Sequence, residues 1–201
     1  MEREEMYPFL IRVAIPRVDK HYLPKGLEDS NWIWDAVFRA HRDVLTGRGN
    51  VTEYSTKVES FKAGRMNRKV NIVASYLYDL IIDKIKNGEM LSSKKLISEM
   101  KDSEQSSPVP FGQLQKLVNM TLKYMVILQS FGKIDPVVDA DACDCPIDSI
   151  IINKLGLGAE YRWTSLTESE YKELQERVDK EIQTDSRLKY DFIVWQEPLE
   201  Q

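Results

Sequence analysis

Cysteine and histidine are scarce in this sequence, and each occurs only twice. Cys143 and Cys145 are separated by one residue, a spacing that makes a disulfide between them geometrically awkward, so we expect two free thiols and a reducing compartment, the cytoplasm. The alternative, two soft ligands to zinc, has no partners nearby, because His21 and His41 lie far away in the sequence and no second cysteine pair exists. We therefore expect no metal and no other cofactor.

Long apolar runs and an excess of positive charge are missing as well. No segment reaches the roughly 18 apolar residues of a membrane span, and the acidic opening MEREEMYPFLIRV does not resemble a signal peptide. We expect no membrane contact. The formal net charge of -4 excludes a global positive field for nucleic acid, although a local basic patch remains possible. No phosphate-binding loop, Rossmann fingerprint, HExxH or Gly-x-Ser-x-Gly motif occurs, which argues against the common nucleotide-binding, metalloprotease and hydrolase mechanisms.

One local basic cluster precedes an apolar helical run that ends at Gly88. Its members are Lys57, Lys62, Arg65, Arg68 and Lys69. Clusters of this length are common on solvated helix faces, and the alternative is a patch that contacts DNA or another nucleobase-containing ligand through its phosphates. The oligomeric state stays open.

Helical periodicity dominates the remaining sequence, and strand-like alternation is scarce. A chain of 201 residues suits one domain with a sizeable core. The clearest loop is KDSEQSSPVP at residues 101–110, which is a possible boundary between two lobes. We therefore predict an all-α fold over residues 1–201, with six to eight helices and possibly two helical lobes with a cleft between them.

Several helix ends carry specific signals. Ser30 is expected to be the N-cap of a helix over residues 31–45, and Gly88 is expected to end a helix with a lysine-rich last turn. Thr167 and Glu170 have the spacing of a capping box. Pro146 stands where the first residue of a helix is often proline.

The central stretch of the chain runs from Phe111 to Leu155. A helix after Pro110 is predicted by an apolar stripe, made of Leu114, Leu117, Val118, Thr121, Leu122, Met125 and Leu128. Lys116 falls in its second turn, where burial and positive potential would activate an amine nucleophile. Asp148 falls at the start of the next helix, where the helix dipole favours a carboxylate that can stabilise an oxocarbenium-like transition state. The alternative is an exposed lysine and an ordinary helix-start aspartate.

These motifs resemble a known family. Gln115-Lys116 followed by LVNMTLKY, and Pro146-Ile147-Asp148 ahead of an apolar helix, are similar to the helix-hairpin-helix DNA glycosylase superfamily, above all to its archaeal 8-oxoguanine glycosylase branch. The separation of 148 − 116 = 32 residues is also similar. The resemblance implies a DNA repair enzyme of base excision, a glycosylase and lyase, in which Lys116 attacks C1′ of a flipped nucleoside and Asp148 manages charge and protons.

Four further residues are expected to contact the substrate. Gln115 and Asn119 belong to the lysine motif, and Lys123 lies seven residues after Lys116 on nearly the same helix face, which makes it the alternative lysine. Trp163 is a candidate for stacking on a base. His41 is expected to be a surface or core residue rather than a general base.

The sequence departs from the family at its DNA-anchoring hairpin. That Gly-hydrophobic-Gly turn normally lies between the lysine and the aspartate, whereas this interval offers only residues 130–133, SFGK, and the turn Gly156-Leu157-Gly158 follows the aspartate. Members with an iron–sulfur loop are excluded, because no four-cysteine array exists. Two alternatives therefore stay open: a non-enzymatic helical module that binds protein or nucleic acid, and a base-modifying relative of the same superfamily.

Overall fold

A computed structural model describes residues 28–45, 72–104, 109–182 and 186–196. This part of the chain is all-α, as predicted, and it contains no strand beyond one isolated parallel bridge between Leu91 and Val138. Its helices are α2 (Glu28–Leu45), α4 (Ile72–Lys86), α5 (Ser93–Asp102), α6 (Phe111–Ser130), α7 (Ser149–Lys154), α8 (Glu168–Glu181) and α9 (Arg187–Gln196), with short 3-10 helices η3 (Ala140–Ala142) and η4 (Trp163–Ser165).

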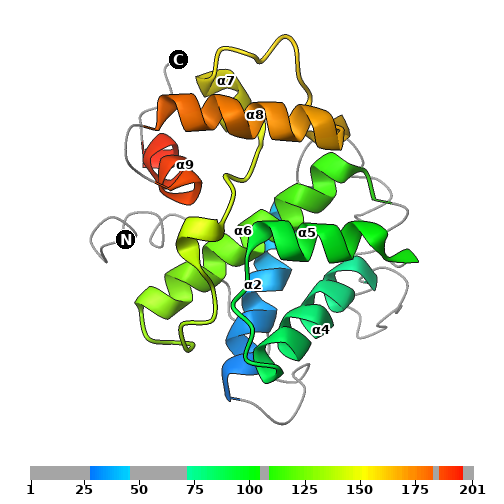
Figure 1. The fold of residues 1–201 in the computed structure, drawn as a ribbon, viewed down its shortest axis with the longest axis vertical. Helices are drawn as coiled ribbons and strands as arrows, with labels where there is room; N and C mark the ends of the chain where they lie inside the picture. Colours follow the sequence, from blue (N-terminus) through cyan, green and yellow to red (C-terminus); the bar gives the residue numbers. More distant parts are fainter. Residues whose placement is uncertain (1–27, 46–71, 105–108, 183–185, 197–201) are drawn as a thin grey trace.

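The helix α6 lies at the centre of the molecule. It contacts α2 and α5 on one side and α8 and η4 on the other, and Figure 1 shows it passing between the group α2, α4 and α5 and the group α7, α8 and α9. Every side chain from Leu114 to Leu128 is buried. The predicted apolar stripe is therefore only part of the buried surface, because the flank that carries Lys116 and Lys123 is covered as well. Whether the two groups of helices form separate lobes stays a prediction.

Local signals placed several helix ends correctly. Gly88 follows α4 with a φ of 72°, the left-handed conformation in which glycine ends helices. Thr167 and Glu170 form the complete capping box at the start of α8. The predicted N-cap at Ser30 is wrong, because α2 already begins at Glu28 and includes Ser30. The basic cluster of residues 57–69 lies outside the described residues.

The short helix η4 packs directly against the first turn of α6. A Cβ atom on Gly112 would lie 1.9 Å from the carbonyl oxygen of Trp163 and 3.0 Å from the backbone nitrogen of Leu166. Only a residue without a Cβ atom permits this approach of backbone to backbone. Gly112 thus allows Trp163 to sit beside the next turn of α6, where Lys116 lies.

None of the described helices combines the length and the hydropathy that crossing a membrane requires.

The variant Gly112→Ala tests the contact between α6 and η4. We expect a loss of about 1–3 kcal/mol in the free energy of unfolding, because the added methyl group collides with backbone that cannot rotate away. Urea denaturation measures this loss as a lower midpoint. The matched control is Gln113→Ala, which removes atoms from the same turn, and equal midpoints for the two variants would contradict the prediction.

A second prediction concerns His41, which is buried on α2. Burial lowers the pKa of His41 to about 4 in the folded protein, against about 6.5 in an unfolded chain. Below pH 6.5 the unfolded state therefore takes up a proton that the folded state does not, and stability falls as the pH drops. We expect His41→Leu to reduce the loss of unfolding free energy between pH 7 and pH 5, by about 2 kcal/mol. If native protein and His41→Leu showed the same pH dependence of the unfolding free energy, this prediction would be refuted.

Candidate functional site

Lys116 and Asp148 meet in space. The Nζ atom of Lys116 lies 3.4 Å from the Oδ2 atom of Asp148, and the two side chains are 10% and 5% exposed. The alternative of an exposed surface lysine is therefore wrong. Burial of either charge alone would be costly, so each ion compensates for the lost hydration of the other. The tertiary fold brings together the two residues that the sequence motifs singled out.

Asp148 divides its two carboxylate oxygens between two tasks. Oδ1 accepts hydrogen bonds from the backbone N–H groups of Ile150 and Ile151, at 2.9 and 3.1 Å, and so caps α7. Oδ2 is left to face Lys116. The helix thus begins at Ser149 with Asp148 as its N-cap. The prediction that Pro146 is the first helical residue is wrong, because the cap falls two residues later.

Trp163 covers the ammonium group of Lys116. The Nζ atom lies 4.3 Å from the centre of the indole ring, a distance at which a cation is attracted to the face of the ring. Trp163 comes from η4, on the connection between α7 and α8. The lysine nitrogen therefore has an anion and an aromatic face as neighbours. Of the four residues predicted to contact a substrate, Trp163 is the one whose ring lies over the Lys116 nitrogen.

Gln115 and Asn119 are buried and bonded to the protein itself. The Nε2 atom of Gln115 donates to the carbonyl oxygens of Gly112 and Ile147, both at 2.9 Å, and its Oε1 atom accepts from the N–H of Ile147 at 3.3 Å. Asn119 donates to Gln115 at 3.2 Å and to the hydroxyl of Tyr171 at 2.9 Å. In the structure, Gln115 binds the segment that leads to Asp148, and Asn119 binds Gln115. Contact of either residue with a substrate stays a prediction.

Lys123 forms a second buried ion pair, with Asp191 of α9. Both side chains are fully buried, and Lys123 also lies 4.9 and 5.5 Å from the ring centres of Phe192 and Trp195. Burial raises the pKa of Asp191, and the charge of Lys123 opposes that rise. Asp191 was not among the site residues that the sequence motifs predicted. Its signal was a single acidic residue inside the apolar run YDFIVW.

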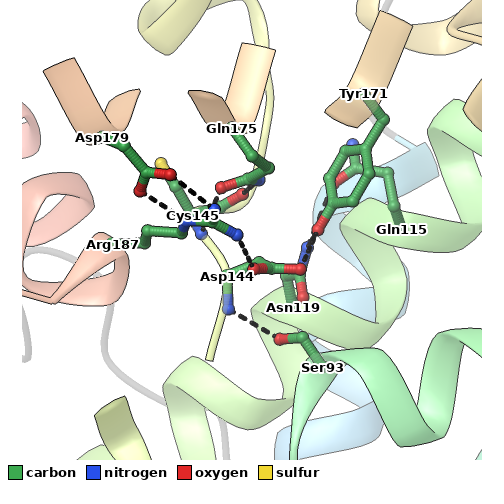
Figure 2. Close-up of polar contacts among 9 residues, drawn as sticks. All are labelled: Ser93, Gln115, Asn119, Asp144, Cys145, Tyr171, Gln175, Asp179 and Arg187. Carbon is green, nitrogen blue, oxygen red and sulfur yellow. Dashed lines mark hydrogen bonds and ion pairs between the residues drawn. The ribbon is translucent and has the colours of Figure 1, made fainter. Parts of the chain in front are cut away.

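Asp144 is the centre of a polar network that was also missed (Figure 2). Its backbone N–H donates to Ser93 at 2.8 Å, and its carboxylate accepts from Tyr171 at 2.7 Å and from Arg187 at 2.6 Å. Arg187 also donates twice to Asp179, both times at 2.7 Å. The network joins α5, α8 and α9 to the segment just before Asp148.

Cys143 and Cys145 are free thiols, as predicted, and both are buried. Burial raises the pKa of Cys143 to about 12 and that of Cys145 well above its ordinary value. Both thiols are therefore protonated at neutral pH, which makes them poor nucleophiles. Among the residues that the structure describes, no three His, Cys, Asp or Glu side chains gather in a way that suits a metal ion.

The two glycine turns that follow α6 and α7 use their N–H groups within the protein. After α6, the N–H groups of Gly132 and Lys133 bond to the carbonyls of Gln129 and Leu128, each at 2.9 Å. After α7, the N–H groups of residues 156 and 157 bond to the carbonyls of residues 153 and 152 in the same pattern. These are helix ends of the Schellman type, and these four N–H groups are not directed at a phosphate.

Neither a protein-family model, nor a curated protein, nor a solved structure matches this chain.

The variant Asp148→Asn tests the ion pair without removing the helix cap. Asparagine keeps an oxygen for the N–H groups of α7, but it leaves the ammonium of Lys116 buried without a carboxylate. We expect a loss of about 3 kcal/mol in the free energy of unfolding, measured by urea denaturation. The exposed Asp79→Asn is the control. Addition of Lys116→Met to Asp148→Asn should restore part of the loss, and no recovery would contradict the pairing.

Proposed function

We propose that this chain is a DNA glycosylase-like enzyme that cleaves the N-glycosidic bond of a modified or damaged base through Lys116 and Asp148. The observation that carries the proposal is the distance of 3.4 Å between Lys116 Nζ and Asp148 Oδ2, because it joins two motifs 32 residues apart. An amine and a carboxylate at this distance are the two groups that such chemistry requires.

The chemistry follows from the two groups in order. Lys116 must first lose a proton, and the nearest anion in the described site is the Oδ2 atom of Asp148. The free amine then attacks C1′ of the deoxynucleoside while the bond from C1′ to the base nitrogen breaks. The base leaves with the electron pair and takes up the proton that Asp148 received from Lys116, which leaves Asp148 ionised beside the positively charged sugar adduct. Asp148 then takes a proton from the bound nitrogen and passes it to the ring oxygen O4′ as the bond from C1′ to O4′ breaks, and the product is the imine between lysine and C1′.

Trp163 supplies a planar apolar face next to the reacting nitrogen. A flipped base needs a surface on which to stack, since it loses the stacking of the duplex. The position of the Trp163 indole ring, whose centre lies 4.3 Å from Lys116 Nζ, supports this role. Because the net charge is -4, DNA contact would depend on a local basic patch such as residues 57–69.

A non-enzymatic helical module is the second candidate function. The bonding of the N–H groups at Gly132 and Gly156 to their own helices favours it, because these turns then offer no phosphate anchor of the hairpin type. In that case the pair of Lys116 and Asp148 would be a structural ion pair. A base-modifying relative of the same superfamily would instead keep a reactive site but transfer a different group.

Trapping with borohydride separates these candidates. Native protein is incubated with duplex oligonucleotides that each carry one modified base or an abasic site, and borohydride reduces the imine between lysine and C1′ to a stable amine. We expect a covalent protein–DNA adduct from the native protein and none from Lys116→Gln. Lys172→Gln, at a side chain that is 68% exposed, is the control and should keep the adduct.

Each outcome of this assay is informative. An unchanged adduct in Lys116→Gln would remove Lys116 from the mechanism. No adduct from native protein with any of the oligonucleotides would overturn the glycosylase and lyase proposal and favour the binding module. Circular dichroism checks that both variants retain their helices.

A further inference from the structure

The segment that ends at Asp148 is held at residues 144, 145 and 147 by side chains from four helices. Ser93 of α5, Tyr171 of α8 and Arg187 of α9 bind residue 144, as described above. The next two contacts are made by glutamine amides, which bind the backbone at residues 145 and 147. Figure 2 shows Ser93, Tyr171, Arg187 and Gln175 converging on residues 144 and 145. Such a dense set of contacts fixes the position of the chain along its own direction.

Gln115 connects the lysine helix to the aspartate segment. Its amide binds both backbone groups of Ile147, donating to the carbonyl at 2.9 Å and accepting from the N–H at 3.3 Å. Gln115 is followed directly by Lys116, and Ile147 is followed directly by Asp148. The paired hydrogen bonds between Gln115 and Ile147 therefore set the register of the two segments. In this register the next residue of each segment, Lys116 and Asp148, face each other.

Gln175 repeats this arrangement from the opposite side. It lies on α8, and its amide donates to the carbonyl of Cys145 at 2.7 Å and accepts from the N–H of the same residue at 3.2 Å. Gln175 is buried, with 2% of the residue exposed. Because Pro146 stands between the two bound residues and has no N–H, the two amides satisfy both N–H groups that residues 145–147 possess.

We propose that Gln115 and Gln175 are positioning residues that set Asp148 at its working distance from Lys116. This inference rests on the proposed function, and it gives Gln115 a role through Asp148 in place of direct substrate contact. A displacement of about 1 Å at a reacting pair lowers rates by up to about 100-fold. The paired amide bonds prevent such a displacement, since a shift of the segment would break both bonds of each pair.

The same helix supplies a matched control. Gln129 also lies on α6, and its amide accepts from the N–H groups of Val137 and Val138, at 2.9 and 2.6 Å, and donates to the carbonyl of Val138 at 3.2 Å. It stands 14 positions after Gln115, or about 21 Å along the helix axis. Removal of the Gln129 amide breaks hydrogen bonds between a glutamine side chain and a loop backbone, as in the other two variants, but far from Lys116 and Asp148.

The experiment compares Gln115→Met, Gln175→Met and Gln129→Met in two assays. In the first, acetic anhydride labels lysines, and mass spectrometry compares the rate at Lys116 with the rate at the exposed Lys172. In the second, borohydride traps the adduct with a duplex that carries one abasic site, at several DNA concentrations. Gln175→Met keeps the test decisive if Gln115→Met fails to fold, which circular dichroism detects.

The expected result is specific to the two positioning residues. Gln115→Met and Gln175→Met should label faster at Lys116, because the amine is released from Asp148. Their trapping rate at saturating DNA should fall by about 10- to 100-fold, while the DNA concentration for half-maximal rate stays nearly unchanged. Gln129→Met should match native protein in both assays despite a similar loss of stability.

One outcome would overturn the positioning role of Gln115 and Gln175, and another would overturn the proposed reaction. If all three variants behave alike in labelling and trapping, the amides are merely structural and the positioning role is refuted. If native protein forms no adduct, the proposed reaction fails, and the labelling rates alone then decide whether Gln115 and Gln175 hold the pair together.

Discussion

Burial of positive charge on α6 is the constraint on which the rest of the structure depends. Lys116 and Lys123 lie seven residues apart, on the flank of a helix whose side chains are covered all round. A buried ammonium is tolerated only with a partner, because its lost hydration costs several kcal/mol. The partners come from elsewhere in the chain: Asp148 from the start of α7 and Asp191 from α9. The charges of α6 therefore determine where the C-terminal helices dock.

The segment before α7 converts this docking into a defined geometry. It has no regular structure of its own, so its backbone groups need partners from neighbouring helices. Gln115 and Gln175 bind its backbone, Asp144 joins it to α5, α8 and α9, and Asp148 ends it as a helix cap. Because Asp148 uses Oδ1 for the cap, only Oδ2 faces Lys116, and one residue couples the start of α7 to the candidate site.

Local signals predicted much of the helical architecture. The capping box of Thr167 and Glu170 and the glycine end of α4 at Gly88 depend on residues a few positions apart, and the sequence displays them directly. The helix starts predicted at Ser30 and Pro146 were wrong, because each residue type is compatible with a helix start without requiring one. The start of α7 is set by the side chain of Asp148, which caps the helix. The helix therefore begins at Ser149 and not at Pro146.

The sequence by itself determined the all-α class, the central helix after Pro110 and the two residues worth testing as a pair. Only the tertiary structure decided that Lys116 is buried rather than exposed, that Trp163 lies over it, and that Gln115 binds the backbone beside Asp148. The physical reason is that helical periodicity reports which faces are apolar, whereas the burial of a polar side chain depends on partners distant in the sequence. Such partners are identified by packing, and no local pattern encodes them.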